Sequence, residues 1–291
     1  MRIGLYSGDI KRANADVIFG KIAKFGFECV QFGFNDITET NFIKTGEFEI
    51  PDKIDGDVIA LIKNCSEKYN VEIIACNATF NMAHPDSKIR EEGIKRFDIT
   101  LSAVQKLGCK IVSICSGTRN REHMWTYHPG NSSPEAWQDM ADTLKKCVKI
   151  AEKYNMIIAI ETEVATVIDT PEKAKKIMDE INSKNIKMIM DCANLFHAGE
   201  AKKENVKSII SHAFGIFGNA LVLAHGKDIK ESGGVKFCPT GEGIIDYNYF
   251  VELLNEYNYK GDMILHGIFD ESKMPRCYQV IKAATDGGVT L

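Results

Sequence analysis

Short aliphatic runs alternate along the chain with longer segments in which apolar residues recur every three or four positions. The short runs are typical of parallel strands, because such strands are buried on both faces. The longer segments have the period of an amphipathic helix, as in residues 136–151, where the apolar side chains gather on one face. Strands are predicted at residues 2–6, 28–34, 71–77, 110–115, 156–162, 187–191, 221–226 and 262–268.

Capping residues and a short repeat mark the boundaries between these elements. Residues 133–135 (Ser-Pro-Glu) and 170–172 (Thr-Pro-Glu) each place a capping hydroxyl, a proline and an acid at the start of a predicted helix. The tetrapeptide Glu-Lys-Tyr-Asn occurs at 67–70 and at 152–155, each time directly before an apolar strand. The chain therefore repeats one unit, in which a helix ends and a strand begins.

Repeated strand–helix alternation favours an α/β fold whose strands close into a single (β/α)8 TIM barrel. The competing fold is a doubly wound open sheet, which usually carries a glycine-rich phosphate loop after its first strand. Residues 7–11 read Ser-Gly-Asp-Ile-Lys, without a dinucleotide-binding or Walker A pattern. Because no low-complexity linker divides the chain, we predict one barrel domain over residues 1–291.

Composition and charge argue against several classes of protein. The 291 residues are 44% hydrophobic and carry a net charge of -4, which does not indicate the excess of basic residues that a nucleic-acid-binding protein needs. Nine cysteines without a Cys-x-x-Cys pair indicate buried thiols in a reducing compartment. The first residues are strand-like and lack a signal-peptide core, and residues 213–224 are too short to cross a bilayer. We expect a cytoplasmic protein with no nucleic-acid or membrane partner.

Four of the apolar runs end on a residue that can bind a metal ion: Glu161, Asp191, His225 and His266. The carboxyl ends of the strands of such a barrel meet at one mouth, so ligands from four strands can converge on one cation. Each residue alone is equally an ordinary polar group at a strand end, but the recurrence favours metal binding. Glu163 can face the same way as Glu161 and is a weaker candidate, as a ligand, as a partner of a ligand or as a solvated group.

The segments 160–163 (Ile-Glu-Thr-Glu), 190–195 (Met-Asp-Cys-Ala-Asn-Leu), 224–228 (Ala-His-Gly-Lys-Asp) and 241–247 (Gly-Glu-Gly-Ile-Ile-Asp-Tyr) resemble the sugar-phosphate isomerase/epimerase family, whose members have a xylose-isomerase-like TIM barrel. The most specific part is the His-x-Lys-Asp step followed by Gly-Glu-Gly-x-x-Asp-Tyr. Residues 117–137 resemble one branch of the family, and the similarity extends over nearly the whole chain.

The resemblance implies a divalent metal ion held by Glu, Asp, His and Glu, of which the first three match Glu161, Asp191 and His225. It also implies that two carboxylates on opposite faces of the substrate move the proton next to a carbonyl, while the metal stabilises the enediolate. His266 stands at the fourth position. Glu161 can still be the base, but the returning acid is then an imidazole, or the reaction uses one face, as in an aldose–ketose isomerase. The added nitrogen favours Mn²⁺, Zn²⁺ or Co²⁺ over Mg²⁺, unless His266 only contacts substrate.

Further polar residues near the mouth are candidates for contact with a carbohydrate substrate. Lys227 can bind a substrate oxygen or pair with Asp228, and Asn194 can orient a sugar hydroxyl or shape a turn. His84, in the loop after the third predicted strand, can contact substrate or be merely exposed. The candidates are Asn81, His84, Arg119, Trp125, His128, Asn194, Lys227 and Glu242.

The long loop at residues 116–128 is predicted to act as a lid, because long ordered loops on a barrel tend to be functional. Trp125 offers an apolar wall for a sugar, and Arg119 a fork for a phosphate or carboxylate; a packed surface loop is the alternative. Glu242 can support a ligand histidine or a substrate hydroxyl from behind. Residues 231–234, just before it, are expected to be disordered.

These features favour a divalent-metal isomerase or epimerase of a small sugar or sugar phosphate, with Glu161 as the base. The alternatives are a metal-dependent dehydratase similar to inosose dehydratase, and a barrel that binds sugar or metal without catalysis. Apurinic endonucleases share the barrel, but they need more histidines and a basic groove than seven histidines and a charge of -4 provide. The substrate, its phosphorylation and the metal are left open, and a homo-oligomer is possible.

Overall fold

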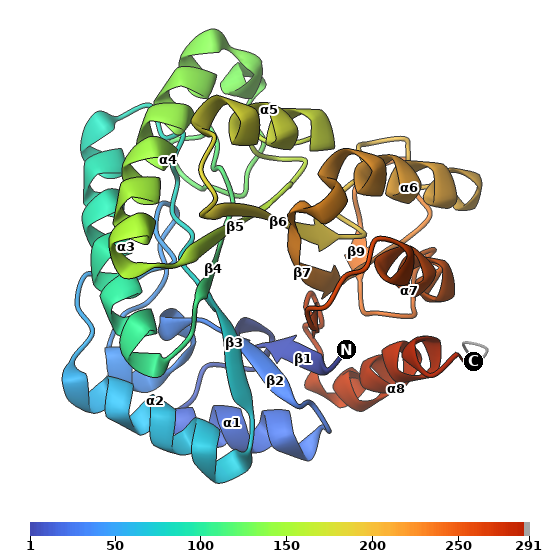
Figure 1. The fold of residues 1–291 in the computed structure, drawn as a ribbon, viewed down its shortest axis with the longest axis horizontal. Helices are drawn as coiled ribbons and strands as arrows, with labels where there is room; N and C mark the ends of the chain where they lie inside the picture. Colours follow the sequence, from blue (N-terminus) through green and yellow to red (C-terminus); the bar gives the residue numbers. More distant parts are fainter. Residues whose placement is uncertain (288–291) are drawn as a thin grey trace.

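Eight parallel strands close into a barrel in the computed structural model, which describes residues 1–287 (Figure 1). The prediction of an α/β barrel with eight strands is confirmed. The last four residues of the predicted domain, 288–291, lie outside the described residues. In the order β1-β10-β7-β6-β5-β4-β3-β2 around the ring, the strands are β1 (Ile3–Tyr6), β10 (Met263–Leu265), β7 (Leu221–Gly226), β6 (Ile186–Asp191), β5 (Ile157–Glu161), β4 (Ile111–Ile114), β3 (Glu72–Asn77) and β2 (Cys29–Phe32).

Seven of these strands lie within the predicted ranges, and β6 begins one residue earlier than predicted. The side chains of Ser133 and Thr170 accept backbone amides at the starts of α4 and α5, as their capping patterns predict. The α-helices are α1 (Ala15–Lys24), α2 (Gly56–Tyr69), α3 (Ser87–Leu107), α4 (Pro134–Tyr154), α5 (Pro171–Ile181), α6 (Val206–Phe217), α7 (Tyr247–Glu256) and α8 (Met274–Thr285). Short 3-10 turns are η1 (Ser7–Asp9), η2 (Phe34–Asp36), η3 (Thr38–Thr40), η4 (Pro129–Ser132), η5 (Lys203–Asn205), η6 (Gly218–Ala220) and η7 (Glu271–Lys273).

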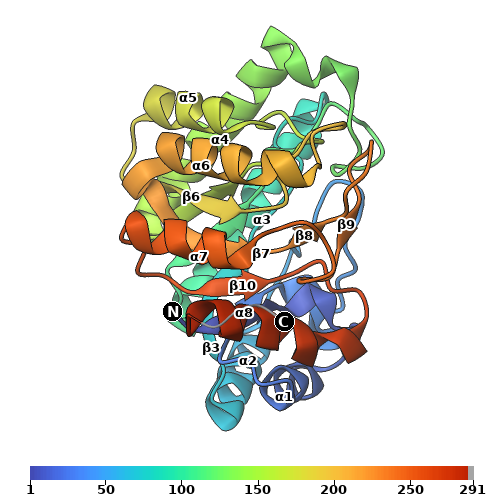
Figure 2. The same ribbon diagram turned by 90° about the vertical axis from the view of Figure 1, so that its right-hand side faces the viewer.

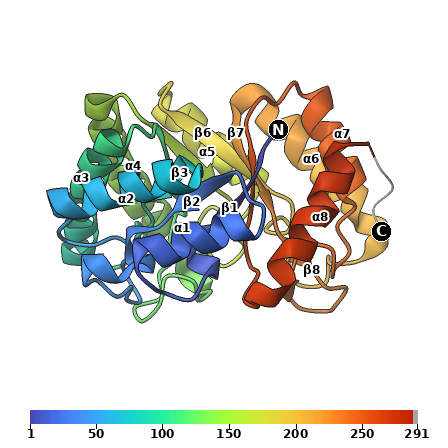
Figure 3. The same ribbon diagram turned by 90° about the horizontal axis from the view of Figure 1, so that it is seen from below.

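The helices surround the barrel, and consecutive helices pack against each other (Figures 1 and 2). Seen from below, α1 and α2 lie on one side of the molecule and α7 and α8 on the other (Figure 3). The main apolar core fills the layer between strands and helices. Within the described residues, we find no helix with the length and apolar character needed to cross a membrane.

A two-stranded antiparallel hairpin of β8 (Asp228–Ile229) and β9 (Phe237–Cys238) follows β7 (Figure 2). Residues 231–234, which were expected to be disordered, form the loop of this hairpin. The backbone amide of Lys230 donates to the carbonyl of Lys236, and the amide of Ser232 donates to the carbonyl of Ala201. The expectation is corrected because these long-range backbone hydrogen bonds order a segment whose composition alone suggests flexibility.

Candidate active site

The inside of the barrel explains why polar side chains gather at its mouth. A small apolar layer fills the interior, made of Cys29, Ala75, Ala159, Ile189, Leu223 and Ile264. Side chains alternate along a strand, so the residue two positions after each of these points to the same interior at a higher level. The polar residues reached in this way are Gln31, Asn77, Glu161, Asp191, His225 and His266, and Tyr6 and Ser113 complete the ring on β1 and β4.

Four residues of this ring come together as a candidate metal site. Glu161, Asp191, His225 and His266 each offer one ligand atom, and these atoms all lie within 4.8 Å of one another. His266 Nε2 is 2.6 Å from Asp191 Oδ2, and His225 Nδ1 is 3.3 Å from Glu161 Oε1. The two imidazole rings pack edge to face with their centroids 4.6 Å apart. The structure thus brings the four sequence-predicted ligands to one point.

The orientations of Asp191 and His225 fit a cation at this point. Asp191 Oδ1 accepts the backbone amides of Ala193 and Asn194, so Oδ2 is the oxygen turned to the cluster. His225 Nε2 lies 2.8 Å from Gln31 Oε1, which can only accept, so Nε2 carries the proton. Nδ1 therefore turns a lone pair towards the carboxylate oxygens of Glu161 and Asp191. An imidazole lone pair and carboxylate oxygens that point to one position are typical ligands of a divalent cation.

Electrostatics keep the central carboxylate ionised. Burial alone would raise the pKa of Asp191, but the hydrogen bond from His266 and the charge of Lys227 hold it well below its usual value. Burial opposes protonation of His266, whereas its hydrogen bond to Asp191 raises its pKa overall. Asp191 is therefore a carboxylate at neutral pH and available as a ligand.

A short hydrogen-bond chain links the predicted base to a buried ammonium. Asn194 Nδ2 donates to Glu161 Oε1 at 2.7 Å, and Lys227 Nζ donates to Asn194 Oδ1 at 2.8 Å. Lys227 also lies over the ring of Phe237, 3.5 Å from its centroid. Glu163 lines the same pocket outside the four-residue cluster, and burial raises its pKa to about 7 although the charge of Lys227 opposes this. Asn194 and Lys227 thus orient Glu161, and both line the pocket.

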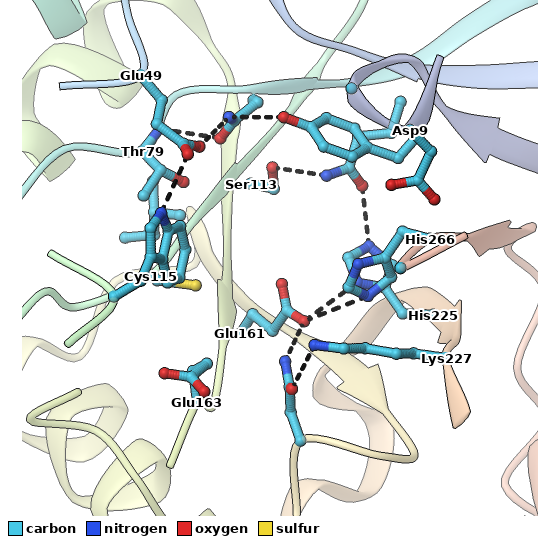
Figure 4. Close-up of a pocket in the computed structure, with 18 of the residues that line it drawn as sticks. Asp9, Glu49, Thr79, Ser113, Cys115, Glu161, Glu163, His225, Lys227 and His266 are labelled. Atoms are coloured by element: carbon cyan, nitrogen blue, oxygen red, sulfur yellow. Dashed lines mark hydrogen bonds and ion pairs between the residues drawn. The ribbon is translucent and has the colours of Figure 1, made fainter. Parts of the chain in front are cut away.

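The pocket above the cluster has a volume of about 400 Å³ and a second polar wall (Figure 4). Figure 4 shows Glu161, His225, His266 and Lys227 on one side and Glu49 on the other. Glu49 accepts hydrogen bonds from the indole nitrogen of Trp125 at 3.0 Å and from Asn77 Nδ2 at 2.8 Å. Trp125 therefore lines the pocket, as predicted for a wall residue.

Comparison with known proteins agrees with this architecture. Residues 19–283 match the model of the family described as xylose isomerase-like TIM barrel. The chain belongs to this family. The resemblance inferred from the motifs is therefore confirmed, and the barrel has the expected xylose-isomerase-like form.

The relatives are enzymes, among them a sugar-phosphate epimerase and a dehydratase. An inosose dehydratase from Glaesserella parasuis is 25% identical over 232 residues, which cover 75% of this chain and 76% of that protein. An L-ribulose-5-phosphate 3-epimerase from Escherichia coli is 20% identical over 210 residues, 72% of this chain and 68% of that protein. The structure of an IolI protein with a bound zinc atom matches with a TM-score of 0.71 at 16% identity and covers 100% of both chains. At that identity the structural match shows the fold alone.

The two segments that most resemble the family are tied together by Asp228. This buried carboxylate pairs with backbone amides and not with Lys227: it accepts those of Ile229, Gly241, Gly243 and Ile245. A Cβ atom on Gly243 would lie only 2.1 Å from Asp228 Oδ1, so the loop approaches as closely as glycine allows. The Gly-Glu-Gly motif therefore shapes the loop next to Lys227.

The structure does not support the predicted role of Glu242. Its side chain is exposed and pairs with Lys273 at 2.7 Å, outside the pocket. The loop conformation set by Asp228 directs this side chain away from the barrel mouth. The prediction that Glu242 supports the site is therefore corrected, because this residue forms an ion pair at the surface.

Arg119 is also placed differently from the prediction. Its Nη1 pairs with Asp139 Oδ2 at 2.6 Å and donates to the carbonyl of Ala83, which anchors the side chain outside the pocket. Arg119 ties the long loop at residues 116–128 to α4.

Three other candidate contacts hold loops in place. Their acceptor atoms are used locally, and they do not belong to the residues that line the pocket. Asn81, His84 and His128 accept the backbone amides of Thr118, Asp86 and Gly130, respectively. The structure therefore does not support these three residues as substrate contacts, because their side chains lie outside the pocket and hold the loops that carry them.

Sequence reasoning missed Gln31, Ser113 and Glu49, which are all buried at the pocket. The signal for Gln31 was its position two residues after the interior residue Cys29, the same rule that relates Glu161 to Ala159. Glu49 lies in an irregular segment after β2, where no periodicity applies.

Proposed function

We propose that this protein is a divalent-metal-dependent isomerase or epimerase of a small sugar or sugar phosphate. The observation that carries the proposal is the four-residue cluster, with ligand atoms within 4.8 Å of one another at the floor of a pocket. Glu161 Oε1 takes the hydrogen bond from Asn194, while the other carboxylate oxygen points into the pocket (Figure 4). That oxygen is the proposed base for a proton next to a carbonyl.

Glu161, Asp191 and His225 would hold the metal ion, and His266 would either complete the ligand set or, when it is not a ligand, serve as a proton donor. A bound divalent cation would supply Lewis-acid polarisation of the substrate carbonyl and offset the negative charge that develops on its oxygen. Two imidazoles beside two carboxylates suit Mn²⁺, Zn²⁺ or Co²⁺ better than Mg²⁺. The zinc of the IolI structure is consistent with this preference.

The rest of the site supports proton transfer at Glu161. Lys227 acts through Asn194, whose amide holds one oxygen of Glu161 and leaves the other for the substrate. His266 faces Glu161 across the cluster, with Nε2 3.8 Å from Oε1. The imidazole is the proposed proton donor for an epimerase, whereas an aldose–ketose isomerase needs only Glu161.

A dehydratase is the second candidate, favoured by the inosose dehydratase relatives. Glu161 would again remove the proton next to the carbonyl. The hydroxyl on the following carbon would then leave as water, with a proton supplied by His266, so that one water is lost for each substrate. A barrel that binds sugar without reaction is the remaining alternative. The nine free, buried cysteines support the proposed cytoplasmic location, since a reducing compartment preserves thiols.

Deuterium exchange tests this proposal. Protein stripped with a chelator is reloaded with Mn²⁺, Co²⁺, Zn²⁺ or Mg²⁺ and incubated in D₂O with free ketoses, aldoses, inososes and their phosphates. We expect metal-dependent deuterium at the carbon next to the carbonyl, and its loss in Glu161→Gln. Glu242→Gln is the matched control, because it makes the same change outside the pocket and keeps exchange.

Two results would contradict the proposal. Exchange that persists in a folded Glu161→Gln variant removes Glu161 as the base. If no compound exchanges deuterium with any of the metals, the proposed enzymatic activity is refuted and the alternative of a binding protein is favoured. Loss of water from the substrate, followed by mass spectrometry, identifies the dehydratase.

A further inference from the structure

The wall of the pocket opposite the candidate metal ligands is built around the carboxylate of Glu49. The side chain is only 8% exposed. One oxygen accepts the indole N–H of Trp125 and the other accepts the amide of Asn77, while Lys44 Nζ lies 3.7 Å away. A carboxylate has about four lone-pair positions, so these donors leave acceptor capacity on the pocket side.

Three loops hold this carboxylate in position. The amide of Glu49 donates to the carbonyl of Thr79 after β3, and the preceding residue, Phe48, forms a β-bridge with Phe80. The amide of Met124 donates to the carbonyl of Gly46 at 2.7 Å, which attaches the loop after β4 to the same segment. Glu49 is therefore a rigid acceptor that does not need to be ordered when a ligand binds.

The charges around the pocket disfavour an anionic substrate at this wall. Of the described residues that line it, four carry carboxyl groups, namely Asp9, Glu49, Glu161 and Glu163, and two are lysines. Burial raises the pKa of Asp9, and raises that of Glu163 to about 7, so the negative charge at this wall comes mainly from Glu49. Lys227 already donates to Asn194 and lies over the ring of Phe237, so only part of its donor capacity is left for a ligand.

The other cations are no better placed to bind a phosphate. Lys44 is 60% exposed at the rim and faces Glu49. No arginine is among the described lining residues, and Arg119 is paired with Asp139 outside the pocket. A phosphate group would therefore meet a buried carboxylate without a guanidinium fork to bind it.

We propose that the pocket takes an uncharged polyhydroxylated carbonyl compound, such as a free sugar or a cyclic polyol ketone, and that Glu49 selects it. This inference rests on the proposed function, because the carbonyl end of the compound would lie at Glu161 and the metal ligands. A hydroxyl at the other end donates to Glu49, and Trp125 supplies an apolar surface for its C–H groups. The same carboxylate repels a phosphorylated form of the compound.

Binding measurements on the metal-loaded protein test the selection without requiring turnover. A panel of free ketoses and cyclic polyols is titrated by calorimetry, each compound beside its own monophosphate. We expect at least one neutral member to bind about tenfold or more tightly than its phosphate, since like charges at a binding site disfavour the wrong partner. Equal or tighter binding of the phosphates overturns the inference, and so does failure of every neutral compound to bind.

Variants then assign the selection to Glu49. Glu49→Gln is expected to weaken binding of the neutral compound about tenfold, because a charge-assisted hydrogen bond is lost. It is also expected to reduce the difference in affinity between the neutral compound and its phosphate. Glu47→Gln is the matched control in the same loop, since Glu47 does not line the pocket. Metal affinity stays unchanged in both variants if Glu49 acts on the substrate only. A Glu49→Gln variant that folds, binds metal and keeps the full preference overturns the role of Glu49.

Deuterium exchange separates this inference from the proposed function. Exchange that occurs only in phosphorylated compounds keeps the isomerase or epimerase and overturns the neutral substrate. If neutral compounds bind more tightly but none of them exchanges deuterium, the proposed enzymatic activity is refuted, whereas the inferred ligand preference of the pocket is supported.

Discussion

Gln31 is the residue whose replacement tests how the candidate metal site is oriented. Its Oε1 accepts the Nε2 proton of His225, and its Nε2 donates to Ser113 Oγ at 3.0 Å. Both Gln31 and His225 are buried. In Gln31→Met the side chain keeps nearly the same volume but loses the acceptor. The proton of His225 then moves to Nδ1, where it can donate to Glu161 Oε1, and the lone pair intended for the metal disappears.

The size of this effect follows from the hydrogen bond that is lost. Leaving a buried donor without a partner costs about 1–3 kcal/mol, and removing a residue that orients a metal-binding histidine typically lowers metal affinity about 10- to 100-fold. We therefore expect the affinity of Gln31→Met for Zn²⁺ or Mn²⁺ to fall within that range, measured by competition with a chelator of known affinity.

Two companion variants make the test specific. Gln31→Glu keeps an acceptor for His225 Nε2 and is expected to retain or increase metal affinity, because a carboxylate behind a histidine raises its basicity. Ser113→Ala removes only the outer partner of Gln31 and should change affinity less than Gln31→Met. Metal affinity within about twofold of the wild type in folded Gln31→Met would refute the reasoning.

Three further predictions concern stability. Asp228→Asn turns an amide group towards backbone donors and should lower the free energy of unfolding by about 2–4 kcal/mol in urea titrations, whereas an unchanged midpoint would show that the four hydrogen bonds of Asp228 contribute little. Burial raises the pKa of Asp36 from 3.8 to about 7, against the hydrogen bond from Ser7. The folded state then keeps a proton that the unfolded state loses, so between about pH 4 and pH 7 the wild type should lose up to about 1.4 kcal/mol per pH unit relative to Asp36→Asn, with no further change above pH 7; a constant difference across this range would contradict the raised pKa. Zn²⁺ at 100 times its dissociation constant should stabilise the wild type by about 2.7 kcal/mol and Asp191→Asn by less, and equal stabilisation in thermal melts would place the ion elsewhere.

The barrel and the convergence of the four candidate ligands could be predicted from the order of residues along the chain. Each ligand ends an aliphatic run, and parallel strands of similar length bring their ends to one level. The alternation along each strand relates Glu161 to Ala159 and His225 to Leu223 inside the barrel. These are local rules, and a sequence displays them directly.

The roles of the other polar residues could not be predicted in this way, because they depend on contacts made in the folded chain. Arg119 and Glu242 have side chains suited to binding substrate, but their directions depend on Asp139 and Lys273, which are distant in the chain. Glu49 has no pattern around it, and three loops place it at the pocket. The physical reason is that a polar side chain points to whichever partner satisfies its hydrogen bonds, and outside regular strands that partner is chosen by the folded chain.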